Sequence, residues 1–237
     1  MSTIATNIAK VGTRIREAAQ AVARDPDEVH LLAVSKTQPA EAIRAASEAG
    51  LHDFGENYLQ EALEKQAELS ELPISWHFIG PIQSNKTKQI AEHFDWVHSV
   101  DRLKIAKRLS DQRPEQLAPL NICLQVNVSG EASKSGCEPQ EVSELARAIA
   151  ALPRLRLRGL MTIPEPTDDP AEQRAAFARL RQLQTELKLN LDTLSMGMSQ
   201  DLEAAIAEGA TWVRIGTALF GARAYPSQTA ADAPQHE

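Results

Sequence analysis

H-L-L-A-V-S-K-T-Q-P, residues 30–39, is an apolar run that leads into a lysine and then a turn-forming proline. An apolar run rich in Leu and Val predicts a β-strand that is covered on both faces. Side chains alternate along a strand, so Leu32, Val34 and Lys36 share one face. If that face lines the interior of a barrel, Lys36 points into a mostly dry site. The alternative is a strand-end lysine that reaches solvent.

Strand-like and helix-like segments alternate along the rest of the chain. The predicted strands are residues 30–36, 51–55, 74–79, 96–100, 121–128, 156–163, 191–195 and 211–215. Each is followed by helix-like sequence, and an amphipathic helix within residues 1–24 precedes the first strand. Eight strand–helix units in about 250 residues predict a (β/α)₈ TIM-type barrel. An open doubly wound sheet is the alternative, but the chain has no G-x-G-x-x-G turn.

The composition of the chain argues against two classes of binding partner, nucleic acids and membranes. The 237 residues carry a net charge of −7 and only 4% aromatic residues, which argues against nucleic-acid binding. We find no membrane-length apolar run and no signal peptide. Cys123 and Cys137 lack metal-ligand spacing and are read as reduced thiols. We therefore expect a cytoplasmic, monomeric protein with one domain over residues 1–237 and a mobile polar tail at 225–237.

A closed barrel brings the first and last strands together, and it places active groups at the carboxyl ends of the strands. In the last strand, Arg214 has the parity that points inward, beside Lys36. Gly216 lets a ligand approach the backbone, and Thr217 opens a helix. Ser199 stands at a predicted helix start at 199–208, so the four residues together predict a phosphate site next to an amine. Taken singly, Ser199 is an ordinary N-cap residue and Arg214 an ion-pair residue.

A buried lysine near a phosphate site suggests imine chemistry, because desolvation favours the neutral amine that attacks an aldehyde. Pyridoxal 5′-phosphate (PLP) is an aldehyde that also carries a phosphate and a ring nitrogen. Arg214 would donate a hydrogen bond to that nitrogen and, by keeping its own proton, leave the ring unprotonated. Such a ring is a weaker electron sink, which favours holding or releasing the cofactor, or racemase-like proton transfer.

Two further residues are candidates with ordinary alternatives. His77 lies within the third predicted strand, and either packs as a core histidine or acts as a ligand. Lys134 lies in the long loop after the fifth strand, and is either a second amine that receives a departing cofactor or a surface lysine. The histidines show no metal-binding spacing, so we expect no metal site.

Several segments resemble the pyridoxal phosphate homeostasis protein family. They are A-V-S-K at 33–36, D-F-G-E-N at 53–57, W-H-F-I-G-P-I-Q-S-N-K at 76–86, G-L-M-T-I at 159–163, S-M-G-M-S at 195–199 and V-R-I-G-T-A-L-F-G at 213–221. The resemblance covers nearly the whole chain in order. It implies a single-domain barrel similar to the N-terminal barrel of alanine racemases, without established catalytic activity, that supplies or buffers PLP. PLP-dependent apoenzymes would be its recipients.

The resemblance also implies roles for individual residues. PLP would be held as an imine on Lys36, with Arg214 near the pyridine nitrogen and Asn57 near the cofactor. Phosphate contacts would come from Ser199, Gly216 and Thr217.

Two enzyme hypotheses stay open beside this one. The first is a PLP-dependent racemase acting on amino acids, although the second proton-transfer base has no obvious source because the chain ends shortly after the last barrel element. The second is an aldolase-like barrel that uses Lys36 on a sugar phosphate.

Overall fold

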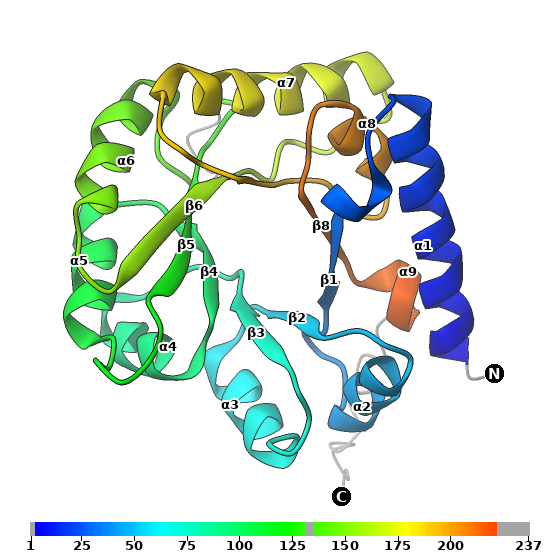
Figure 1. The fold of residues 1–237 in the computed structure, drawn as a ribbon, viewed down its shortest axis with the longest axis horizontal. Helices are drawn as coiled ribbons and strands as arrows, with labels where there is room; N and C mark the ends of the chain where they lie inside the picture. The colour runs from blue at the N-terminus through cyan, green and yellow to red at the C-terminus, as the bar shows by residue number, and fades with distance from the viewer. Residues whose placement is uncertain (1–2, 131–134, 222–237) are drawn as a thin grey trace, which may run out of the picture.

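A closed barrel of parallel strands forms the centre of the molecule (Figure 1). The computed structural model describes residues 3–130 and 135–221. Within these residues eight strands pair in chain order: β1 (His30–Val34), β2 (Asp53–Glu56), β3 (Ser75–Phe78), β4 (Trp96–Val100), β5 (Leu120–Gln125), β6 (Leu155–Met161), β7 (Thr193–Ser195) and β8 (Trp212–Ile215). The ring closes where β8 pairs with β1. The predicted (β/α)₈ barrel is confirmed, and the open doubly wound sheet is wrong.

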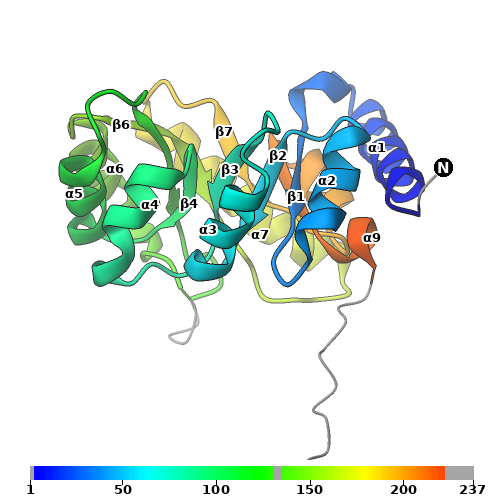
Figure 2. The same ribbon diagram turned by 90° about the horizontal axis from the view of Figure 1, so that it is seen from below.

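Helices surround the barrel and alternate with its strands. They are α1 (Thr3–Ala21), α2 (Ala40–Glu48), α3 (Leu59–Glu68), α4 (Thr87–His93), α5 (Leu103–Gln112), α6 (Val142–Ala150), α7 (Pro170–Leu187), α8 (Leu202–Ala207) and α9 (Thr217–Phe220). Short 3₁₀ turns are η1 (Pro26–Glu28), η2 (Ser84–Lys86) and η3 (Pro139–Glu141). The predicted N-terminal helix is present as α1, which lies outside the barrel against α2, α8 and α9 (Figures 1 and 2).

The register of the closing pair fixes the level of the inward-facing residues. Leu32 of β1 lies opposite Arg214 of β8, and Ala33 lies opposite Ile215. Leu32 packs inside the barrel, whereas Ala33 and Ile215 belong to the layer between strands and helices. The predicted parity is therefore confirmed, and Arg214 points inward next to the strand that leads to Lys36.

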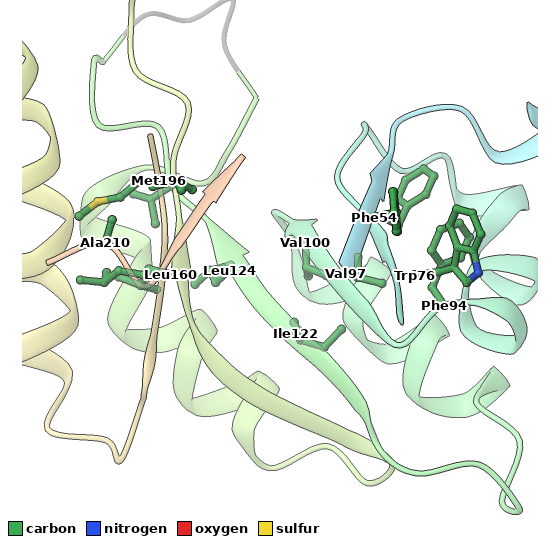
Figure 3. Close-up of a cluster of buried hydrophobic side chains, with 14 of the residues drawn as sticks. Phe54, Trp76, Phe94, Val97, Val100, Ile122, Leu124, Leu160, Met196 and Ala210 are labelled. Atoms are coloured by element: carbon green, nitrogen blue, oxygen red, sulfur yellow. The ribbon is translucent and has the colours of Figure 1, made fainter. Parts of the chain in front are cut away.

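Two apolar clusters stabilise this arrangement. The larger one lies between the strands and the helices, where Phe54 of β2 and Trp76 of β3 stand with ring centroids 6.2 Å apart (Figure 3). The smaller one fills the barrel interior. Its members are Leu32, Ile79, Trp96, Cys123, Met161 and Trp212, with Val34 packed against them. Because the interior is filled with side chains, the site lies at a mouth of the barrel rather than in a pore.

Some predictions fall on parts of the chain that the structure does not describe. Lys134 and the tail at 225–237 lie outside the described residues. Among the helices that the structure describes, none combines the length and the apolar character that a membrane span requires.

Candidate functional site

A cavity of about 570 Å³ opens at the carboxyl ends of the strands. Its volume falls within the roughly 300–1,000 Å³ typical of small-molecule sites. The six residues predicted from the sequence all line it: Lys36, Asn57, Ser199, Arg214, Gly216 and Thr217. They come from the ends of β1, β2, β7 and β8, so barrel closure gathers residues that are far apart in the sequence.

Lys36 lies two residues beyond the end of β1, in a turn, and is half-buried. Its neighbour Ser35 is fully buried, and the Ser35 N–H donates to the Gly55 carbonyl at 3.0 Å. Thr37, on the other side, has a φ of +63°. A left-handed backbone is strained for a β-branched residue, so the turn needs partners that hold it.

Three charged side chains supply those partners: the buried Lys65 and Glu56, and the partly exposed Glu61. We call them the β2–α3 cluster. Lys65 Nζ lies 2.8 Å from Glu56 Oε1 and 2.5 Å from Glu61 Oε1. Lys65 also donates to the Ser35 carbonyl at 2.8 Å. The two carboxylates of the cluster therefore pair with one buried ammonium group, which also donates a hydrogen bond to the backbone just before Lys36.

The same carboxylates contact the backbone and side chains around Lys36. The Ser35 hydroxyl donates to Glu56 Oε1 at 2.6 Å, and the Thr37 N–H donates to Glu61 Oε1 at 2.6 Å. Burial raises the pKa of Glu56, and the Lys65 charge opposes that shift. The cluster thus fixes the chain on both sides of Lys36. The sequence carried a sign of it in the spacing of Glu61 and Lys65, four residues apart on one helix, but it could not indicate that Glu56 completes the set.

Arg214 extends from β8 into the base of the cavity and is 4% exposed. Its Nη1 donates to Ser195 Oγ at 2.8 Å, and its Nη2 donates to the Thr162 carbonyl at 2.9 Å. Burial lowers the pKa of the guanidinium to about 10, so it stays charged near neutral pH. Within the described residues no carboxylate lies at ion-pair distance from it. These contacts leave further N–H groups for a ligand in the cavity.

The loop that carries Ser199 differs from its prediction. The helix predicted at 199–208 begins only at Leu202, with Asp201 at its N-cap, so the reading of Ser199 as a helix-start residue is wrong. The physical reason is a turn: Gly197 has a φ of +99°, and the Met198 N–H donates to Asp201 Oδ1 at 2.6 Å. Ser199 still lines the cavity, from this turn rather than from a helix.

Helix α1 contributes to the same loop, which the sequence did not indicate. Arg14 of α1 donates to the Ser199 carbonyl at 3.1 Å and forms an ion pair with Glu203 at 2.8 Å. Arg14 also lines the cavity. The extra helix therefore fixes the position of the Ser199 turn.

Two close backbone approaches shape the remaining walls. A Cβ on Gly216 would lie 3.2 Å from the Val34 carbonyl oxygen, so a glycine lets the end of β8 approach β1. A Cβ on Gly80 would lie 2.2 Å from the Asn57 carbonyl oxygen, so only a glycine fits against that residue. The Asn57 amide oxygen is buried and has no hydrogen-bond partner among the described residues. A buried acceptor at a cavity wall is the position where a ligand donor would bind.

His77 does not line the cavity but lies in the barrel interior, fully buried with His98. The interpretation of His77 as a core histidine is therefore confirmed. Burial lowers the pKa of His77, although the neighbouring Asp53 opposes the shift. Burial, with the nearby His77 and Arg214, lowers the pKa of His98 well below its ordinary value. Both rings are therefore neutral in the folded protein near pH 7.

These shifts predict a pH-dependent stability. Below a pH of about 6.5 the unfolded chain binds protons at these histidines that the folded chain does not, so the free energy of unfolding falls as the pH falls. Each histidine contributes up to about 1.4 kcal/mol per pH unit. Denaturant titrations between pH 5 and 7 should show a shallower slope for His98→Gln than for the wild type. His93→Gln, at an exposed position, is the control and should keep the wild-type slope.

Known proteins resemble this chain over nearly its whole length. The family model of the alanine racemase N-terminal domain matches residues 7–224. The chain is 76% identical over 225 residues to the pyridoxal phosphate homeostasis protein of Pseudomonas aeruginosa, covering 95% of this chain and 98% of that protein. The chain belongs to the pyridoxal phosphate homeostasis protein family. The homeostasis protein of Escherichia coli is 54% identical over 231 residues, with 95% and 99% of the two chains covered.

Two solved structures also resemble this chain. PipY of Synechococcus elongatus, in its structure with bound PLP, is 42% identical with a TM-score of 0.81, and 92% of this chain and 100% of that chain are covered. Alanine racemase of Corynebacterium glutamicum is 19% identical with a TM-score of 0.65, and 93% of this chain corresponds to 61% of that chain. At that identity the racemase shares the barrel fold alone with the homeostasis protein family.

Proposed function

We propose that this protein binds PLP covalently through Lys36 and holds it for supply to PLP-dependent apoenzymes, as a cytoplasmic monomer. The observation that carries the proposal is the shared cavity: an amine from the end of β1 and a buried guanidinium from β8 line one pocket. The bound PLP in the PipY structure and the names of the family's members support the choice of ligand.

The donor set fits the parts of PLP. The hydroxyls of Ser199 and Thr217 and the backbone at Gly216 are the groups we assign to the phosphate, beside the charge of Arg14. The unpartnered Asn57 oxygen marks a second polar contact of the ligand. When bound, PLP supplies an aldehyde that condenses with an amine, and Lys36 is the amine at the cavity wall.

The chain's own residues set how the cofactor is used. Arg214 stays charged and can only donate, so it binds the ring nitrogen without giving up a proton. An unprotonated ring withdraws electrons weakly, which favours storage and release over carbanion chemistry. The β2–α3 cluster holds the chain on both sides of Lys36, which orients the amine toward the cavity.

A titration with PLP tests the binding, and a transfer assay tests the supply. The protein should bind about one PLP and gain a visible absorption band, while Lys36→Ala should lose that band. The loaded protein should then restore activity to a PLP-dependent apoenzyme, at a rate distinguishable from that of an equal concentration of PLP in solution. A wild-type protein that stays colourless with PLP would overturn the proposal.

A further inference from the structure

An unbroken series of side-chain hydrogen bonds crosses the barrel interior from the cavity to the opposite mouth. We call it the interior line, and its members in order are Arg214, Ser195, His98, His77 and Asp53. Its contacts are 2.8 Å from Arg214 Nη1 to Ser195 Oγ and 2.7 Å from Ser195 Oγ to His98 Nδ1. They continue with 2.9 Å from His98 Nε2 to His77 Nδ1 and 3.0 Å from His77 Nε2 to Asp53 Oδ1.

The interior line is enclosed between its two ends, the cavity at Arg214 and the opposite mouth at Asp53. Ser195, His98 and His77 are fully buried. His77 stacks on Trp96 at 5.4 Å with nearly parallel rings, and Trp212 lies 4.9 Å from the same imidazole. Asp53, the first residue of β2, has a side chain that is 33% exposed. The line thus joins a dry interior to a solvent-accessible carboxylate.

The two ends of the interior line fix the direction of every bond. A guanidinium can only donate and a carboxylate can only accept. His77 must therefore carry its proton on Nε2, which leaves Nδ1 to accept from His98 Nε2–H. His98 Nδ1 then accepts the Ser195 hydroxyl proton, and the Ser195 oxygen accepts from Arg214. The reverse direction would set two acceptors, the His77 ring nitrogen and the Asp53 carboxylate, against each other.

Because every hydrogen bond in the line points the same way, the line strengthens the acceptor that Arg214 donates to. Hydrogen bonds in a dry interior polarise one another, so each acceptor in the series becomes a better acceptor for the group before it. Arg214 has no carboxylate at ion-pair distance within the described residues. The charge of Asp201, at the same cavity, acts on the guanidinium through space, and the interior line connects the guanidinium to Asp53 through hydrogen bonds. The line orients Arg214 while its outer N–H groups stay available to the cavity.

We propose that the interior line makes Asp53 a positioning residue for Arg214, so that a carboxylate at one mouth of the barrel sets how strongly Arg214 donates to a ligand at the other. The identity of that ligand as PLP rests on the proposed function. The interior line consists only of the protein's own side chains, so its hydrogen bonds can be measured without PLP.

The test compares Asp53→Asn with Asp192→Asn. Asparagine keeps the shape and an acceptor oxygen but removes the charge. Asp192 is the matched control, because it lies beside the same mouth, next to β7, and pairs with Arg158 at 2.9 Å without contacting the line. In the cofactor-free wild type, ¹⁵N spectra should show His77 and His98 protonated on Nε2. Asp53→Asn should shift the His98 Nδ1 and Arg214 side-chain resonances, and Asp192→Asn should leave them unchanged.

With PLP added, Asp53→Asn should weaken binding roughly threefold to tenfold and move the visible absorption maximum. In a Ser195→Ala background, which cuts the line beside Arg214, Asp53→Asn should cause no further change in the Arg214 resonances or in affinity.

Three results would overturn the inference: His98 protonated on Nδ1, equal spectra for the two aspartate variants, or an undiminished effect of Asp53→Asn in the Ser195→Ala background. If the wild type binds no PLP, the proposed function fails. The histidine tautomers and the Arg214 resonances of the cofactor-free protein still test whether Asp53 acts on Arg214 through the interior line.

Discussion

Lys65→Met is expected to lower the free energy of unfolding by about 3–5 kcal/mol, because it leaves the buried Glu56 carboxylate without its cation. Glu56 is fully buried, and one of its oxygens already has no hydrogen-bond partner among the described residues. Chemical denaturation at pH 8 measures the loss. Since burial raises the pKa of Glu56 and Lys65 opposes that shift, the loss should shrink as the pH falls and the carboxyl takes up a proton.

Two variants separate this explanation from a simple loss of packing. Lys65→Met combined with Glu56→Gln should recover much of the lost stability, because neither charge then remains unpaired. Lys88→Met is the matched control, since Lys88 pairs with Glu92 at the same helical spacing as Lys65 with Glu61, but at the surface. It should change stability by less than about 0.5 kcal/mol. A loss for Lys65→Met that does not exceed the loss for Lys88→Met would contradict the role of the β2–α3 cluster.

Lys65→Met should also weaken ligand binding in the cavity. Lys65 donates to the carbonyl just before Lys36, and Glu61 accepts from the strained residue just after it. With the cluster broken, the turn that presents Lys36 loses its partners on both sides. PLP binding should therefore weaken even in preparations that remain folded.

Arg214→Ala is expected to weaken PLP binding by about 10- to 150-fold. The physical reason is the loss of the charged hydrogen bond that we propose between Arg214 and the ring nitrogen, worth about 1.5–3 kcal/mol. The visible absorption maximum should move as well, because the electron density of the ring depends on that contact. Arg214→Glu should change both quantities too, since it exchanges a donor for an acceptor. Titration of the purified variants with PLP, followed by absorbance, measures the effects.

Arg158→Ala is the control for Arg214→Ala. Arg158 lies at the opposite mouth, where it pairs with Asp192 and stands 4.6 Å over the Trp96 ring. Its loss removes an arginine without touching the cavity, so affinity for PLP should stay within a factor of about two. Wild-type affinity and spectrum in a folded Arg214→Ala protein would remove this residue from the site.

The residues that face into the barrel could be predicted from the sequence, because two general rules are enough to place them. Side chains alternate along a strand, and a ring of eight strands has to join its last strand to its first. The parity of Val34 and Arg214 followed from the first rule, and their proximity followed from the second. The same reasoning gathered four of the six cavity residues. Ser199 was placed by a helix start that the structure does not contain, and Asn57 by the resemblance to the family alone.

Contacts between distant side chains could not be predicted in this way. One partner of Ser195 is His98, 97 residues away, and neither residue stands in a pattern that distinguishes it from an ordinary strand position. The start of α8 was misplaced because Ser199 is a good N-cap residue, whereas Asp201 takes the cap after the turn at Gly197. Cap preference is a local rule, and here the turn at Gly197 overrides it, with the Asp201 carboxylate accepting from the Met198 N–H.

The central claim is that Lys36 is the amine that holds PLP. Reduction of the PLP-loaded protein with borohydride, followed by peptide mass spectrometry, tests it directly. We expect one pyridoxyl adduct on the peptide that carries Lys36 and none in Lys36→Ala. An unmodified Lys36 in a preparation labelled on another lysine would contradict the account.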